Sequence, residues 1–101
     1  MYDEPVLYYD VHTDIYGAPQ KINIDEFCNG MVIKNSGTTL LIVDGETLNP
    51  GESKSFGGNR MEILVGRHEL SFQTQVPPPA TIINQAVVTS KVYVKPEFRP
   101  K

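Results

Sequence analysis

The stretch that decides the fold runs from Gly30 to Leu64 and reads GMVIKNSGTTLLIVDGETLNPGESKSFGGNRMEIL. It consists of short apolar or alternating runs, and each run is closed by a turn signal. The signals are Asn35-Ser36-Gly37, Asp44-Gly45, Asn49-Pro50-Gly51-Glu52 and Gly57-Gly58-Asn59. Turn signals this closely spaced leave no room for a helix of ordinary length. The stretch therefore predicts an antiparallel β meander.

Two of these signals specify a turn type. Asp44-Gly45 favours a type I′ hairpin, because both central residues of that turn need positive φ. Pro50-Gly51 suits the central positions of a type II turn, since proline presets φ and glycine tolerates positive φ. The first signal, at 35–37, predicts a hairpin between strands at 31–34 and 39–43.

Further strands are predicted on both sides of the meander, because short β-forming runs recur between turn residues. They lie at 6–11, 21–25, 47–48, 53–56, 61–65, 70–73 and 86–94, with a loop at 12–20 and a turn at 66–68. Residues 74–80 include three prolines, which lack amide N–H groups, so an extended connection is expected there. The pattern predicts an all-β fold: a small antiparallel β-sandwich, Ig-like or jelly-roll-like, of about eight or nine short strands.

Alternation within the runs predicts which side chains enter the core. The inward sets are Ile22, Ile24 and Phe27 in one strand, Met61, Ile63 and Val65 in a second, and Leu70 and Phe72 in a third. The run from Leu40 to Val43 is apolar on both faces of the pleat, which predicts a strand covered on both sides. One face would meet the core, and the other an arm, a loop or a partner protein.

The length of 101 residues fits one domain with extended arms. We expect an N-terminal arm at 1–5, the β-sandwich domain at 6–95 and a C-terminal tail at 96–101. The formal net charge is −3 and no basic stripe is present, which argues against a nucleic-acid partner. No run approaches the ~20 apolar residues of a membrane span, and the acidic N-terminus is unlike a signal peptide.

No cluster of residues with catalytic or metal-binding chemistry stands out. His12 and His68 are the only histidines, and Cys28 is the only cysteine. His12 precedes Asp14 by two positions, but this spacing need not bring the two side chains to one site. Cys28 has no neighbouring base and is interpreted as a buried or edge structural thiol. We therefore expect no enzymatic activity, no catalytic residue, no cofactor and no metal site.

Aromatic residues near the two ends are the candidates for binding a partner protein. The candidate partner-binding residues are Tyr2, Tyr8, Tyr9, Tyr16, Phe98 and Arg99. Aromatic side chains in polar, proline-containing termini are typical of arms that dock on a neighbouring protein. Two alternatives stay open: ends that are simply disordered, and a Tyr8 or Tyr9 side chain that packs in the core.

The central stretch resembles a module of tailed-phage virion proteins. The residues that carry the resemblance are Asn35-Ser36-Gly37-Thr38, Asp44-Gly45, Thr47-Leu48-Asn49-Pro50-Gly51-Glu52-Ser53 and Gly58-Asn59. They are mainly turn residues, and the two ends of the chain fall outside the match. Within this group the chain is most similar to auxiliary (decoration) capsid proteins of crAss-like phages.

The resemblance implies a virion structural protein, made in the cytoplasm of a bacterial host and placed on the capsid surface. Such a protein would bind the outer surface of the major capsid protein lattice and stabilise the head by bridging capsomers. Neighbouring copies or other virion proteins are further expected partners, whereas nucleic acid and membrane are not. The alternative is a head-fibre or tail-associated adhesion domain that binds host surface glycans through exposed tyrosines.

Overall fold

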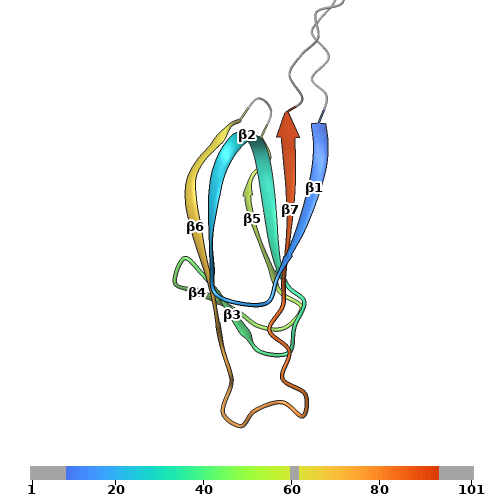
Figure 1. Ribbon diagram of the computed structural model, residues 1–101, viewed down its shortest axis with the longest axis vertical. Coiled ribbons are helices and arrows are strands. Elements are labelled where there is room, and N and C mark those ends of the chain that lie inside the picture. Colours follow the sequence, from blue (N-terminus) through green and yellow to red (C-terminus); the bar gives the residue numbers. More distant parts are fainter. Residues whose placement is uncertain (1–8, 60–61, 94–101) are drawn as a thin grey trace, which may run out of the picture.

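The computed structural model describes residues 9–59 and 62–93, and in these ranges it is all-β, without a helix. The strands, shown in Figure 1, are β1 (Tyr9–Tyr16), β2 (Gln20–Asn35), β3 (Leu40–Val43), β4 (Glu46–Leu48), β5 (Ser53–Gly57), β6 (Leu64–Gln73) and β7 (Ala86–Tyr93). The predicted all-β class is confirmed. The described residues form seven strands, fewer than predicted, because β2 and β6 each join two of the predicted segments. The expected arms at 1–5 and 96–101 lie outside the described residues.

One antiparallel sheet contains all of the described strands, in the order β1-β7-β2-β6-β3-β4, with β5 also paired to β2. β2 is shared by two halves of this sheet. Its first half pairs with β6, from Gln20 opposite Leu70 to Ile24 opposite Gly66. Its second half, at 30–34, pairs with both β5 and β7. The sandwich-like packing is thus made by one continuous sheet that folds over along β2.

The core lies between these two halves. Its buried members are Ile22, Cys28, Met31, Ile33, Leu41, Val43, Leu48, Leu70, Ala86 and Val88. Ile33 from one half, and Leu41 and Val43 from the other, have no exposed surface at all. Removal of such apolar surface from water is the main force that holds the two halves together.

The other face of β3 is only partly covered. Leu40 and Ile42 alternate with the fully buried residues of this strand and are half-buried. Ile42 lines a shallow hollow together with Pro19, which precedes β2, and Lys21, near the start of β2. The second face of β3 is therefore only partly covered, and the residues that cover it belong to the same chain.

Both predicted turn types are confirmed. Asp44 and Gly45 have φ values of 51° and 86°, and they connect β3 to β4 as a two-residue hairpin with Val43 opposite Glu46. In the next turn, Gly51 has a φ of 87°, and the flanking residues close the turn with a backbone hydrogen bond of 2.9 Å from Glu52 N–H to Asn49 C=O.

The hairpin predicted at 35–37 is wrong, because β2 and β3 do not pair with each other. The chain crosses there from one half of the sheet to the other. Asn35 is fully buried, and its Nδ2 donates to the carbonyl oxygens of Thr39 at 2.8 Å and Leu48 at 2.9 Å. Its Oδ1 accepts a hydrogen bond of 3.1 Å from Gly37 N–H. The buried side chain of Asn35 thus supplies the hydrogen bonds that hold the chain in place at this crossover.

Hydrogen bonds join the connection between β6 and β7 to this crossover. Thr38 N–H donates to the carbonyl of Ile83 at 2.8 Å, and Ile83 N–H donates to Thr38 Oγ1 at 2.8 Å. Gly37 lies so close that a Cβ there would be 2.2 Å from the carbonyl oxygen of Ile83. Glycine is required at this position by a close approach of two chain segments.

β1 is longer toward its C-terminal end than predicted. The strand was expected at 6–11 and a loop at 12–20, but residues 12–16 continue β1, and residues 6–8 lie outside the described part. Each residue from Tyr9 to Tyr16 is paired with a residue of β7. This pairing with a distant strand stabilises an extended conformation that the local sequence does not demand.

In β6 the predicted inward pair, Leu70 and Phe72, is confirmed, but the inward set predicted at 61–65 has the wrong phase. The strand runs unbroken through 66–68, where a turn was expected. Ile63 and Val65 are 51% and 84% exposed, and Leu64 packs against the core instead. The alternation that brings Leu70 inward extends back along the same strand to Leu64, because no turn interrupts it.

A further difference lies in the first half of β2. Between Ile24 and Cys28 the pairing with β6 is irregular, and Cys28 takes the inward position. Phe27, predicted to face the core, is 68% exposed. Phe27 is an odd number of residues away from both Ile24 and Cys28, so alternation along the strand places it on the face opposite to theirs. Met61, the remaining member of the predicted inward sets, lies outside the described residues.

Candidate functional site

The folded sheet has two lateral sides where its halves come together. On one side β1 lies opposite the first half of β2, and we call the hollow there the β1–β2 cleft. On the other side β5 meets β6 and the β3–β4 hairpin, and we call this region the β5 corner. The first side is hollow, whereas the second is filled by charged and aromatic side chains.

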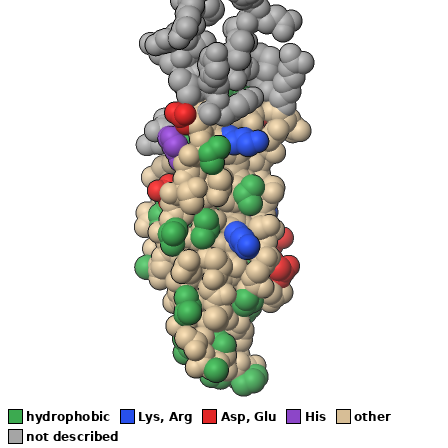
Figure 2. Space-filling view, turned by 90° about the vertical axis from the view of Figure 1, so that its right-hand side faces the viewer, with side chains coloured by type: hydrophobic (Ala, Val, Ile, Leu, Met, Phe, Trp, Pro, Cys, Tyr) green, Lys and Arg blue, Asp and Glu red, His purple; other side chains and the backbone are tan. Residues whose placement is uncertain are grey.

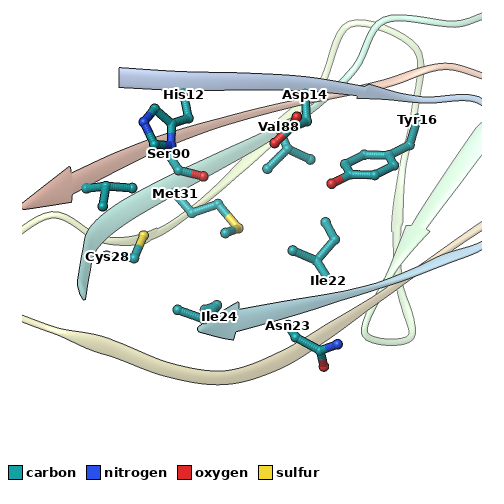
Figure 3. A pocket seen from close by; sticks show the side chains of 11 residues that line it. His12, Asp14, Tyr16, Ile22, Asn23, Ile24, Cys28, Met31, Val88 and Ser90 are labelled. Carbon is teal, nitrogen blue, oxygen red and sulfur yellow. The ribbon is translucent and has the colours of Figure 1, made fainter. Parts of the chain in front are cut away.

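The β1–β2 cleft has a volume of about 190 Å³ and is shown in Figure 3. Its lining residues are His12, Asp14, Tyr16, Ile22, Asn23, Ile24, Cys28, Met31, Val88, Ser90 and Val92. The polar side chains come mainly from β1, and the apolar ones from β2 and β7. The cleft therefore has a polar rim and an apolar floor.

Alternation along β1 produces the polar rim. His12, Asp14 and Tyr16 are two residues apart, so that they project from the same face of the strand, as Figure 3 shows. The sequence did not require His12 and Asp14 to meet, but the structure places both on one hollow. Both of these side chains are exposed, and Tyr16 is half-buried.

Tyr16 stays a neutral phenol at physiological pH. Burial disfavours its anion, and the nearby Asp14 carboxylate disfavours it further, so the pKa of Tyr16 is raised above 10.0. A neutral phenol can both donate and accept a hydrogen bond. Together with the imidazole of His12 and the carboxylate of Asp14, it gives the rim donors and acceptors within a short stretch of strand.

The floor of the cleft belongs to the core. Ile22, Met31 and Val88 are buried there, and Cys28 is 3% exposed. The Cys28 thiol donates a hydrogen bond of 3.3 Å to the carbonyl oxygen of Gly30. The prediction of a buried thiol is confirmed. The cleft can thus hold a small polar group by hydrogen bonds at its rim while an apolar surface packs on its floor.

Side-chain contacts fill the β5 corner. The ring of His68 on β6 stacks on Phe56 of β5, with centroids 4.2 Å apart and planes tilted by 37°. The Nζ atom of Lys54 lies 5.4 Å from the centroid of Phe56 and forms an ion pair with Glu46 on β4. Asp44, in the β3–β4 turn, contacts His68 Nδ1 at 2.6 Å. Five side chains from four segments therefore close this side.

The Asp44 carboxylate is stabilised in its charged form. Burial alone would raise its pKa, but the backbone N–H of Glu69, at 2.8 Å, and the contact with His68 outweigh burial and lower it below 3.8. The charge of Lys54 acts in the same direction. Asp44 thus serves as an anchor that joins the hairpin to β6.

The predicted partner-binding residues fall into three groups. Tyr16 lies on the rim of the β1–β2 cleft. Tyr9 begins β1 and pairs with Tyr93. The remaining candidates, Tyr2, Tyr8, Phe98 and Arg99, lie outside the described residues. The structure therefore brings only Tyr16 into the candidate site.

The spacing of His12 and Asp14 in the sequence does not by itself assign them to one site, and the outer face of β1 was not predicted. Their signal is the alternation from Val11 to Tyr16, with His12, Asp14 and Tyr16 on one face and Val11, Thr13 and Ile15 on the other. It was hidden because 12–20 was interpreted as a loop. Once β1 extends to Tyr16, the alternation assigns both faces.

The outer face of β1, β7 and β2 exposes large apolar side chains. Val11, Ile15 and Val32 are 61%, 65% and 40% exposed. Thr89 on β7 pairs with Thr13 on one side and Val32 on the other, so the three strands share this face. Figure 2 shows this side of the molecule, where hydrophobic side chains are interspersed with basic ones.

The described ranges contain neither a cluster of metal ligands nor a membrane-spanning helix. Among residues 9–59 and 62–93, no three His, Cys, Asp or Glu side chains gather where they could hold a metal ion. The same part of the chain has no helix that is long and apolar enough to cross a membrane. No protein-family model, curated protein or solved structure matches the chain.

Proposed function

We propose that this chain is an auxiliary (decoration) capsid protein, which binds the outer surface of a phage major capsid protein lattice and bridges capsomers. In this role it acts as a structural protein on the virion surface. The observation that carries the proposal is the exposed apolar face of β1, β7 and β2, around Val11, Ile15 and Val32. A sheet face that exposes such side chains fits a protein partner, because apolar side chains at the centre of a contact favour association.

The turn residues support the proposal less directly. Asn35, Gly37 and Thr38, which carry part of the resemblance to phage virion proteins, hold the crossover and the β6–β7 connection in place. Their contacts stabilise the scaffold and do not involve the outer face. Contacts to a capsid would then come from the outer face and from the aromatic ends.

Co-sedimentation with cognate capsids tests this proposal. We expect the wild-type chain to pellet with capsids that lack it, and Val32→Asp to bind at least about tenfold more weakly, since a carboxylate would be desolvated in an apolar contact. Val65→Asp is the matched control, because Val65 is 84% exposed on β6, away from this face. Failure of the wild-type chain to bind capsids, or equal binding by the two variants, would contradict the proposal.

A second candidate function is favoured by the β1–β2 cleft. A neutral tyrosine beside carboxylate, imidazole and amide groups is a combination that suits a sugar, since hydroxyls need hydrogen-bond partners and the sugar ring packs on an aromatic face. In that case the chain is a head-fibre or tail-associated adhesion domain for host surface glycans. Its signature is reproducible binding on a glycan array that is lost in Tyr16→Ala and in Asp14→Ala, with an unchanged melting temperature.

A further inference from the structure

β1 is longer than the other two edge strands of the described sheet, β4 and β5, and one of its two edges is unpaired. β1 pairs with β7 along its eight residues, and no described strand pairs with its other edge. The other edge strands are shorter: β4 has three residues and β5 has five. β5 also carries Lys54, which turns toward Glu46 and guards that edge against pairing. β1 contains neither lysine nor proline.

We propose that β1 is an interaction surface for a second copy of this chain. The two β1 strands pair antiparallel, with Thr13 of one copy opposite Thr13 of the other. Val11 then faces Ile15 of the second copy, and His12 faces Asp14 of the second copy. The two-fold symmetry repeats each of these pairs, so the interface is self-complementary. The paired strands join two sheets into one, with the apolar outer faces side by side.

The residue pattern selects this register over its neighbours. Directly opposed residues in an antiparallel pair point to the same face, so a symmetric pairing must match inward residues with inward ones. A pairing centred on His12 would place Asp10 against Asp14 of the second copy, and one centred on Asp14 would place that carboxylate against itself. Both juxtapose like charges. The pairing centred on Thr13 is free of such contacts.

The same register buries the exposed apolar groups of β1. Val11 and Ile15 are 61% and 65% exposed in the single chain. In the pair each lies opposite an apolar side chain, with the two Thr13 residues between them, and β-branched pairs of this kind stabilise adjacent strands. An eight-residue edge buries less than the roughly 1,000 Å² of a stable interface, so the association is weak and suited to many copies on a surface.

This inference extends the proposed function by naming a second copy as a partner, but it does not depend on capsid binding. It concerns the isolated chain, and the capsid proposal is tested by co-sedimentation. Self-pairing can therefore fail while capsid binding holds, and the reverse is equally possible. If β1 instead pairs with a strand of another protein, the isolated chain should stay monomeric.

Cysteine cross-linking reads the register directly. Under mild oxidation of the full-length chain, Thr13→Cys should form a disulfide-linked dimer, since opposed Cβ atoms lie about 4.5–5.5 Å apart. Val11→Cys and Ile15→Cys should each cross-link poorly alone and form a heterodimer when mixed. Val65→Cys, exposed on β6, is the control for random collisions. Cross-linking of Thr13→Cys no faster than that of Val65→Cys would overturn the proposal.

Sedimentation velocity gives an independent measurement on the unmodified protein. We expect the average mass of the wild-type chain to rise with concentration toward that of a dimer. Ile15→Lys should weaken this association at least about tenfold, because it places a charge in the apolar pairs, whereas Val65→Lys should leave it unchanged. Circular dichroism confirms that both variants are folded; if Ile15→Lys is not, the cross-linking result decides. A wild-type chain that stays monomeric, or equal association by both folded variants, refutes self-pairing.

Discussion

The two lateral sides of the folded sheet are closed in different ways. At the β5 corner, an aromatic pair, the ion pair between Lys54 and Glu46, and the contact between Asp44 and His68 join β5, β6 and the β3–β4 hairpin. At the β1–β2 cleft, the polar side chains of β1 line the rim of a hollow whose floor is apolar. The first side is closed by contacts between side chains, whereas the second keeps a hollow with polar groups at its rim. Substitutions on the two sides should therefore have different consequences.

The largest effect is expected at Phe56. This residue packs against the core and stacks on His68, so Phe56→Ala should lower the free energy of unfolding by about 2–3 kcal/mol. Urea denaturation with fluorescence or circular dichroism measures the change. Phe56→Leu, which keeps most of the volume, should cost less than half as much. A loss below ~1 kcal/mol for Phe56→Ala would mean that the corner is not what holds this side together.

The next effect is expected at Asp44 and depends on pH. Because the folded-state pKa of Asp44 is lowered, its contribution to stability is present above the unfolded-state pKa near 3.8 and is lost as pH falls through the lower folded-state pKa. Asp44→Asn should cost about 1 kcal/mol at neutral pH through weakened hydrogen bonds. The difference from the wild-type chain should shrink between pH 5 and the strongly acidic range, in roughly the window set by these pKa values. A constant difference across a pH series of urea melts would contradict this account.

A smaller effect is expected at Lys54. Its ion pair with Glu46 is partly exposed, and such pairs contribute at most about 1 kcal/mol. Lys54→Met keeps the aliphatic chain over Phe56 and removes the charge, so the melting temperature should change little. The edge of β5 should then be less protected, and the variant should aggregate faster at high concentration. Light scattering during storage, compared with Glu46→Gln, measures this change.

The smallest stability effect is expected on the open side. Asp14→Asn should change the free energy of unfolding by no more than ~0.5 kcal/mol, because Asp14 is exposed and its carboxylate anchors no element in the way that Asp44 does. The same substitution should lower the pKa of Tyr16, since it removes a negative charge that raises it. Ultraviolet titration of the tyrosines reads this change. A large loss of stability would show that the cleft is as much a structural site as the corner.

Turn chemistry is the part of the fold that the sequence could predict. Asp44-Gly45 and Pro50-Gly51 demand particular φ values, and those demands are local. Asn35 looks like a turn residue by the same criteria, yet it acts through a buried side chain that reaches Leu48. Nothing in the local sequence separates the two uses of asparagine. The predicted hairpin failed for that reason.

The candidate site was predictable only in part. Tyr16 was recognised as an aromatic residue that the domain would not fully bury, and it lies half-buried on the rim. The role of His12 and Asp14 depends on β1 extending to residue 16, and that extension depends on pairing with β7, which lies far along the chain. The bend of β2, which creates both lateral sides, likewise follows from pairing and not from a local signal.

The sharing of β2 between the two halves of the sheet has a consequence for how the protein unfolds. Neither half can lose its hydrogen bonds without freeing a part of the strand that supports the other half. Amide hydrogens of β2 at 22 and 31–33 should therefore exchange with solvent only through opening of the whole domain. The outer strands should exchange faster through local fraying. A single strand that passes through both halves makes the described sheet one cooperative unit.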